Sequence, residues 1–291
     1  MKVLIVRKPT NFEQHGTVVE AQVKKGYLDA GSIDFLRKAH DEHYQCLASF
    51  RDLLDANDIS FVEISRGDSW PALDDITAIA SVGGDGTLLS ASHYVETDLP
   101  IVGIRSSSSS VGYLCAGGID ELDRIVKGLK ENSLHYTGAS RLRAKVFRAE
   151  QGKEHLTFPV LNDFLFCNAN PAATTRYRIT TGSDSELQKS SGIWVSTPVG
   201  STAGILAAGG IEMNKRDTRY QFVVRELYQS DGREYKIKSG IFELPQESLV
   251  IENRSGHAIL ALDGERGVLD LAYGDKITFL DVPPVLVADP V

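Results

Sequence analysis

The chain has 291 residues, 42% of them hydrophobic, which allows a packed core in one large domain or two domains of ordinary size. A formal net charge of −8 disfavours nucleic acid and anionic membranes as partners, although a local basic pocket is compatible with it. Apolar runs such as 76–82 are too short to cross a bilayer, and we expect neither a membrane partner nor a targeting segment.

Cys46, Cys115 and Cys167 are widely spaced and lie in apolar contexts, so they predict neither a disulfide framework nor a zinc cluster. A reduced, cytoplasmic location is the simplest expectation, and the expected partner is a small molecule.

In the first half of the chain, strands alternate with helices. Buried strands are predicted at 2–6, 59–64, 76–82 and 101–104, and apolar residues at helical spacing predict helices near 36–54, 88–95 and 120–129. This alternation predicts a parallel sheet that is covered on both faces.

After about Leu134 the chain changes to short strand-like runs separated by turn residues, with one briefly helical stretch at 202–208. We therefore predict an α/β nucleotide-binding domain over 1–136, which 277–291 could rejoin, and a mainly β, dinucleotide-binding domain over 137–276. The expected fold class is a Rossmann-like three-layer α/β domain followed by a β-sandwich-like domain.

The segment Gly83-Gly84-Asp85-Gly86-Thr87 lies between a predicted strand and a predicted helix, at the sheet edge where open α/β proteins bind ligands. Glycines permit unusual backbone angles and close approach of a ligand, and the N–H groups that open a helix bind phosphate. The segment is neither a P-loop nor the dinucleotide fingerprint. Asp85 would repel a phosphate unless it contacts a metal ion or a hydroxyl, so a proton-accepting role fits; the alternative is that Asp85 only caps the helix.

Further motifs follow in a characteristic order: Leu161-Asn162-Asp163, then 196–203 (STPVGSTA) with Ala208-Gly209-Gly210, and finally Asp263-Gly264-Glu265. Together with the segment 83–89 (GGDGTLL), they resemble NAD kinases over nearly the whole chain. The GGDGT motif also occurs in phosphofructokinases and in diacylglycerol and sphingosine kinases, whereas the STPxGSTA segment favours NAD kinases.

The resemblance implies a nucleotide site in the cleft between the two domains. There the γ-phosphate of ATP, or a phosphate of polyphosphate, would pass to the adenosine-ribose 2′-hydroxyl of NAD or NADH, giving NADP(H). Mg²⁺ or another divalent cation would be held through the ATP phosphates, since phosphoryl transfer depends on positioning and charge neutralisation. NAD kinases are commonly dimers or tetramers, so a homodimer or homotetramer is expected.

The resemblance also assigns roles to single residues. Asp85 would be the catalytic base. NAD or NADH would be bound by Gly86, Asn162, Asp163, Thr197, Thr202 and Ala203, with Asp163 on the ribose hydroxyls and Thr202 and Ala203 nearest the adenine. The ATP phosphates would be bound by Gly83, Gly84 and Thr87. The serines of 196–203 could also cap the following helix, and capping and binding are compatible.

The chain departs from the usual NAD kinase pattern in two places. Arg105 and the serine run 106–110 replace a shorter Asn- and Gly-containing loop; Arg105 could neutralise phosphate charge and Ser106 could donate a hydroxyl, but a solvated flexible loop is an equal alternative. Ser190-Ser191-Gly192 replaces a Gly-Asp-Gly sequence, and Gly204 stands where Tyr is common. Similar serines occur in the branch with plant NADH kinases and mitochondrial NAD kinases, so the choice between NAD and NADH as the substrate stays open.

Some residues receive no firm role. His40 and His43 are expected to be packing or surface residues rather than metal ligands. The pairs Arg141/Arg143 and Arg176/Arg178 each share one strand face, which could be a solvated face or a phosphate-binding one. Two other functions stay open for the chain: a lipid kinase of the diacylglycerol or sphingosine kinase type, and a dinucleotide-binding sensor without catalysis.

Overall fold

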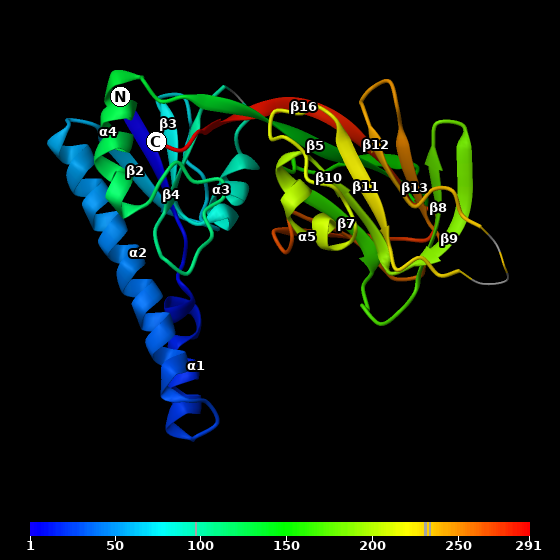
Figure 1. Cartoon of the computed structure of the whole chain (residues 1–291), viewed down its shortest axis with the longest axis horizontal. Coiled ribbons are helices and arrows are strands. Elements are labelled where there is room, and N and C mark those ends of the chain that lie inside the picture. Colours follow the sequence, from blue (N-terminus) through cyan, green and yellow to red (C-terminus); the bar gives the residue numbers. More distant parts are fainter. Residues whose placement is uncertain (97, 230–231, 233) are drawn as a thin grey trace. The chain divides into compact units, whose positions relative to one another are not determined.

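The computed structural model of the chain describes residues 1–96, 98–229, 232 and 234–291 (Figure 1). It is a mixed α/β structure, as the sequence predicts, and the described strands form two sheets. The chain divides into two compact units: unit 1 comprises Met1–Thr137 and Val285–Val291, and unit 2 comprises Gly138–Pro284. The segment that returns to unit 1 is thus shorter than the 277–291 considered from the sequence.

Unit 1 contains a parallel sheet whose carboxyl ends lie at one edge. Its strands, in spatial order, are β2 (Ser60–Ser65), β1 (Lys2–Arg7), β3 (Ala78–Gly83) and β4 (Ile101–Arg105). The end of β16 (Lys276–Ala288) joins β4 in parallel through Val287 and Ile101. Every residue of β3 is buried, as expected for a central strand with both faces covered.

Helices cover both faces of this sheet. Two helices pack on one face of the sheet in one apolar core: α2 (Ala30–Ala56) and α4 (Leu122–Glu131). The short turn η1 (Ile119–Glu121) precedes α4. On the other face, α3 (Asp85–Ser92) brings Leu88 against Gly103 of β4. Within the described residues, none of the helices is both long and apolar enough to span a membrane.

The sequence did not predict α1 (Asn11–Lys24), which precedes α2 (Figure 1). Only Gly16 of this helix is buried, so it lacks the apolar stripe that marks a helix in a sequence. A capping box formed by Thr10 and Glu13 starts it, and an ion pair of 2.6 Å between Arg37 and Glu20 ties it to α2.

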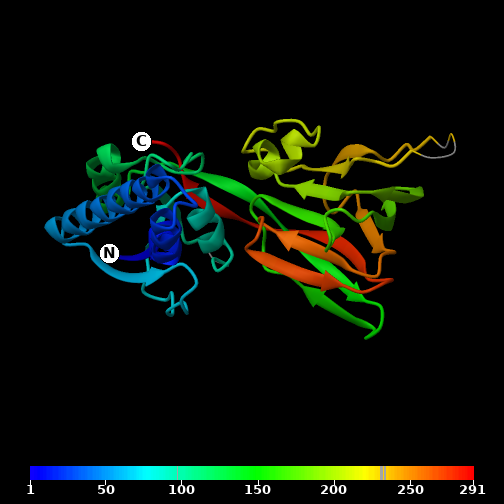
Figure 2. The same ribbon diagram turned by 90° about the horizontal axis from the view of Figure 1, so that it is seen from below.

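Unit 2 is mainly β. One group of strands comprises β16, β5 (Tyr136–Arg148), β6 (Lys153–Leu156), β13 (Leu249–Asn253), β8 (Thr175–Thr181) and β9 (Asp184–Ser190). The other sheet runs β12 (Ser239–Phe242), β11 (Tyr220–Arg225), β10 (Gly192–Ser196), β7 (Asp163–Asn168), β14 (Ala258–Leu262) and β15 (Gly267–Leu271). The long strands β5 and β16 run side by side, green and red in Figures 1 and 2.

Alternate residues of both sheets of unit 2 meet in a single core. Tyr177 and Ile179 of β8 contribute from one sheet, and Phe164 and Phe166 of β7 contribute from the other. The rings of Tyr177 and Phe166 meet edge to face, with centroids 5.7 Å apart. Because strand side chains alternate, the remaining residues of β8 lie on the face of their sheet that points away from this core.

Candidate functional site

The glycine turn of unit 1 is closely packed. A Cβ atom on Gly83 would lie 2.2 Å from Oγ1 of Thr87, which is buried, and one on Gly84 would lie 2.9 Å from Cβ of Ser110. Gly84 has an extended φ of −134°, which any residue can adopt. The expectation that glycine serves an unusual backbone angle is therefore wrong for Gly84. Glycine is needed at this position because the side chain of Ser110 leaves no room for a Cβ atom.

Asp85 is the first residue of α3, and its carboxylate holds the chain that follows β4. Oδ1 accepts the backbone N–H of Leu114 at 2.7 Å, and Oδ2 accepts that of Tyr113 at 3.0 Å. No side-chain capping bond is made at Gly84, the N-cap of this helix. Asp85 is therefore not the cap of the helix, and its carboxylate instead binds the chain that follows β4. Each carboxylate oxygen has a second lone pair, so both can still accept a proton or a ligand hydrogen bond.

The serine run 106–110 is bound to α2. Glu42 accepts the backbone N–H of Ser108 at 2.8 Å and the Ser107 hydroxyl at 2.9 Å, and Nδ1 of His43 lies 2.7 Å from Oγ of Ser106. Ser106 and Ser107 are both buried. These contacts bind the run to α2 and turn the hydroxyl of Ser106 toward the protein.

Two cations stand at the carboxyl edge of the same sheet. Arg105 ends β4, is exposed, and has no side-chain partner among the described residues. Lys8 follows β1, and burial together with the charge of Arg66 lowers its pKa. No motif marks Lys8 in the sequence, although it comes just after the first parallel strand, at the edge where open α/β proteins bind ligands.

The motifs of unit 2 come together around Asp263. Its carboxylate accepts the backbone N–H groups of Leu161 at 3.1 Å, Asn162 at 2.7 Å and Asp163 at 3.1 Å. Asp263 lies in the turn between β14 and β15 with a φ of 46°. The Asp-Gly-Glu motif thus fixes the backbone from which the side chains of Asn162 and Asp163 project.

The segment 196–203 also contacts the backbone of Leu161 and Asn162. The Thr197 hydroxyl donates to the carbonyl of Leu161 at 2.5 Å, and the Thr197 N–H donates to that of Asn162 at 2.9 Å. A Cβ atom on Gly200 would lie 2.1 Å from the Asn162 carbonyl oxygen. Glycine at 200 is therefore required for the contact between the two motifs.

Thr202 and Ala203 lie where two short helices meet, and both are half-buried. The single helix expected over 202–208 is interrupted, because η2 (Val199–Thr202) and α5 (Gly204–Ala207) are separated by Ala203. Neither helix has a side-chain cap; the Ser201 hydroxyl instead donates to the carbonyl of Pro198 at 2.6 Å. The serines of this segment stabilise the turn rather than cap a helix.

Asp163 is a buried acid without a side-chain partner among the described residues. Asp163 is the first residue of β7 and is only 4% exposed. Burial, with the neighbouring charge of Asp263, raises the pKa of Asp163 to about 7, and Arg266 offsets this in part. A buried acceptor of this kind is costly unless a ligand donates to it.

The structure thus gathers the predicted residues into two groups. Unit 1 holds Gly83, Gly84, Asp85, Gly86, Thr87, Arg105 and Ser106, and unit 2 holds Asn162, Asp163, Thr197, Thr202 and Ala203. Within the described part of the chain, no group of three or more His, Cys, Asp or Glu residues forms a metal site.

Known proteins resemble the chain over most of its length, although no family model matches it. A probable NADH kinase of Oryza sativa subsp. japonica is 28% identical over 84% of the chain and 80% of that protein. An NADH kinase of Arabidopsis thaliana is 27% identical over 87% of the chain and 85% of that protein. An NAD kinase of Methanoregula boonei is 31% identical over 64% of each.

Solved structures show the same fold. Yeast NADH kinase, complexed with NADH, has a TM-score of 0.71 at 16% identity, with 100% of this chain and 84% of that chain covered. An NAD kinase from Archaeoglobus fulgidus, in complex with ATP, has a TM-score of 0.66 at 16% identity, with 99% and 93% covered. The resemblance to NAD kinases that the motifs predict, including the branch with plant NADH kinases, is therefore confirmed.

Proposed function

We propose that the chain is an NAD(H) kinase, which transfers the γ-phosphate of ATP to the adenosine-ribose 2′-hydroxyl of NAD or NADH. The observation that carries the proposal is Asp163, a buried carboxyl without a protein partner among the described residues, held at a fixed place by Asp263. The names of the relatives, and the NADH and ATP in the titles of the two solved structures, support the same activity.

In this proposal unit 2 binds the dinucleotide. The ionised carboxylate of Asp163 accepts hydrogen bonds from vicinal ribose hydroxyls, which supply the donors that the protein does not. Asn162 contributes its amide from the same fixed backbone. Thr197 holds the backbone of Leu161 in place through its hydroxyl. The half-buried Thr202 and Ala203 lie against the adenine.

The donor phosphates and the base belong to unit 1. The N–H groups that open α3 and the guanidinium of Arg105 bind phosphate oxygens, and Lys8 adds a further cation. Asp85 takes the proton of the attacking hydroxyl, because its carboxylate is held in place by Tyr113 and Leu114 and retains free lone pairs.

Mg²⁺ or another divalent cation would be held by the ATP phosphates, where it neutralises their charge. The residues of the turn fit such an ion in kind, because the carboxylate of Asp85 offers the hard oxygen ligands that Mg²⁺ prefers.

The decisive test is an assay of the purified chain with ATP and Mg²⁺, with NAD and NADH as parallel acceptors and NADP(H) measured by enzymatic cycling. Polyphosphate replaces ATP in a second arm. Formation of NADP or NADPH supports the proposal, and the ratio of kcat/KM for the two acceptors decides between NAD and NADH.

The same samples separate the alternatives. Phosphorylation of a diacylglycerol or a sphingoid base, with no NADP(H), would overturn the proposal in favour of a lipid kinase. Tight binding of NADH measured by fluorescence, with no product after prolonged incubation, would identify a dinucleotide sensor.

A further inference from the structure

Cations gather on the face of β8 that points away from the core of unit 2. Arg176 and Arg178 project there, since the intervening Tyr177 is completely buried in the core. The sequence left open whether such arginine pairs bind phosphate. The pair on β5 is different, because Arg141 is buried and its guanidinium donates to the carbonyl of Pro283 at 2.8 and 2.9 Å.

The register of the strands places like charges side by side. Lys189 of β9 lies directly opposite Arg176, and on the other side the backbone N–H of Arg254 donates to the Arg176 carbonyl at 2.9 Å. Like charges directly opposite one another in antiparallel strands are destabilising. Lys189 and Arg176 therefore repel each other, and with Arg254 they form a row of three cations in a chain whose net charge is −8.

Few protein groups neutralise this row. Among the described residues, the guanidinium groups of Arg176 and Arg178 have no hydrogen-bond or ion-pair partner. One carboxylate, Glu252, lies opposite Arg178 in the register, but it pairs with Arg254 at 2.5 Å and also faces Lys276 on the next strand.

Tyrosine rings stand at both ends of the row. The ammonium of Lys189 lies 6.0 Å from the ring centroid of Tyr228, and the guanidinium of Arg254 lies 5.6 Å from that of Tyr273. Both tyrosines are more than half exposed, at 57% and 58%. A face of each ring is therefore available for stacking by an aromatic ligand group.

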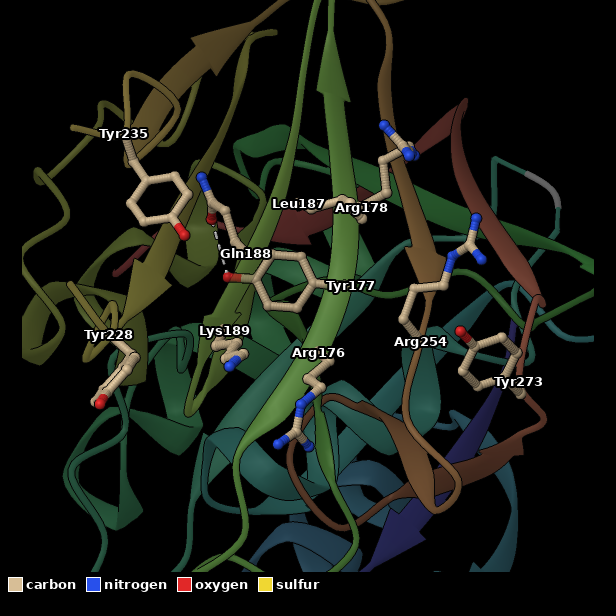
Figure 3. Close-up of a pocket in the computed structure, with 10 residues that line it drawn as sticks. All are labelled: Arg176, Tyr177, Arg178, Leu187, Gln188, Lys189, Tyr228, Tyr235, Arg254 and Tyr273. Carbon is tan, nitrogen blue, oxygen red and sulfur yellow. Dashed lines mark hydrogen bonds between the residues drawn. The ribbon is translucent and has the colours of Figure 1, made fainter. Parts of the chain in front are cut away.

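These residues line a pocket of about 580 Å³, a size typical of small-molecule sites (Figure 3). Figure 3 shows Arg176 and Lys189 next to each other, between Tyr228 on one side and Tyr273 on the other, with Arg178 and Arg254 on the side of Tyr273. The pocket lies wholly within unit 2 and includes none of the residues assigned above to the dinucleotide or to ATP.

We propose that this pocket is a second binding site, for a small molecule that carries two or more phosphate groups. Arginine binds phosphate through paired, charge-assisted hydrogen bonds, and the phosphates would relieve the repulsion within the row. Arg176, Arg178, Lys189 and Arg254 carry four positive charges, and Glu252 offsets that of Arg254. The remaining charge exceeds that of one orthophosphate, which favours a polyphosphate. The ligand is either inorganic polyphosphate or a nucleotide whose base stacks on Tyr228 or Tyr273.

The test is calorimetric titration with inorganic tripolyphosphate. The Arg176→Gln/Lys189→Gln double variant removes two adjacent cations of the row, and Lys127→Gln/Lys130→Gln removes the same charge from α4 in unit 1. We expect the first variant to bind roughly ten-fold more weakly than the wild type or worse, and the second to bind normally. Equal affinity and stoichiometry in both variants would overturn the proposal.

Thermal unfolding gives an independent readout. Tripolyphosphate should raise the Tm of the wild type and of the α4 variant by more than that of the Arg176→Gln/Lys189→Gln variant, which keeps the phosphate-binding residues of unit 1. Without anion, the row variant should unfold at a higher temperature than the wild type, because the repulsion is gone. An unchanged Tm without anion, together with an unchanged response to it, would contradict the proposal.

Titrations with ADP separate the two sources of phosphate. If the ligand is a nucleotide, Tyr228→Leu/Tyr273→Leu should weaken ADP binding and leave tripolyphosphate binding unchanged; if it is inorganic, both titrations should be unaffected by this change. NADP(H) formation at saturating substrate should be unchanged in the row variant, so the proposed site and the proposed activity are tested separately.

Discussion

Asp85 and Leu114 are joined by a hydrogen bond of 2.7 Å from the Leu114 N–H to the Asp85 carboxylate, which ties the start of α3 to the chain beyond β4. A second bond, from Tyr113, uses the other carboxylate oxygen. The residue proposed as the base is therefore also a structural residue. A substitution of Asp85 can therefore change both kcat and the free energy of unfolding, and both have to be measured.

Asp85→Asn should abolish most of the activity. An amide cannot take the proton of the attacking hydroxyl, so kcat should fall by roughly 10² to 10⁴. The amide nitrogen also loses one of the two backbone bonds, which should cost about 1 kcal/mol in the free energy of unfolding. The check is kcat beside a denaturant titration and NADH affinity. Asp120→Asn, at an exposed acid of η1, is the control. Undiminished kcat in a folded Asp85→Asn protein would exclude the role of base.

Gly200→Ala should disrupt unit 2. The added Cβ would lie 2.1 Å from the Asn162 carbonyl oxygen, and this is backbone that cannot rotate away. We expect a loss of about 2 kcal/mol or more in the free energy of unfolding, with weaker NADH binding, because Asn162 and Asp163 would move. Gly256→Ala is the matched control, since a Cβ there meets nothing within 4 Å. If both variants have the wild-type midpoint, the two motifs do not depend on this contact.

The buried acid Asp163 should make stability and affinity depend on pH in opposite ways. Its pKa is about 7 in the folded protein, against 3.8 for an ordinary Asp, so the folded state holds the proton more tightly and loses stability as pH rises through this window. Asp163→Asn should therefore gain stability over the wild type between pH 5 and 8, on the order of 1–3 kcal/mol.

Ligand affinity should change the other way. The wild type should bind NADH more tightly as Asp163 ionises, and the Asn variant should bind weakly at every pH. Asp184→Asn, at an exposed acid in the β9 strand, should change neither stability nor affinity. Identical pH profiles for the wild type and Asp163→Asn would show that Asp163 is not the titrating group.

Glu42→Gln should loosen the serine run. Glu42 accepts from the Ser107 hydroxyl and from both the N–H and the hydroxyl of Ser108, and a glutamine offers one oxygen for these donors. We expect KM for ATP to rise several-fold, since Arg105 precedes this run, and a loss of about 1–2 kcal/mol in stability. Asp41→Asn, at the exposed neighbour on α2, should be neutral. A normal KM for ATP would show that the run does not position the donor.

His43 should give unit 1 a sensitivity to acid. Burial, with the charges of Lys8 and Arg7, lowers its pKa from 6.5 to about 4. The unfolded chain therefore binds the proton more readily, and stability is lost as pH falls from about 6.5 to 4. In His43→Gln, the slope of unfolding free energy against pH should flatten in this window, whereas His15→Gln, at an exposed position, should keep it. Equal slopes in all three proteins would contradict the assignment.

Most strands and helices of unit 1 could be predicted from the sequence, because the spacing of apolar residues along the chain shows which face of each element is buried. The apolar runs that form β1, β3 and β4 are continuous, as central parallel strands require, and α2 and α4 present clear apolar stripes. Helix α1 was missed because its stability comes from a cap and from contacts with α2 rather than from an apolar face.

The sequence by itself determined the motifs, the fold class and the residue types available for chemistry. Only the tertiary structure decided what each residue contacts: that Asp263 holds the backbone of Leu161 to Asp163, and that Glu42 binds serines more than sixty positions away. It also separated the arginine pairs, since Arg141 binds a carbonyl while Arg176 lies in a row of cations. The physical reason is that hydrogen-bond partners and like-charge neighbours are set by strand register and by loop packing, which spacing along one chain does not encode.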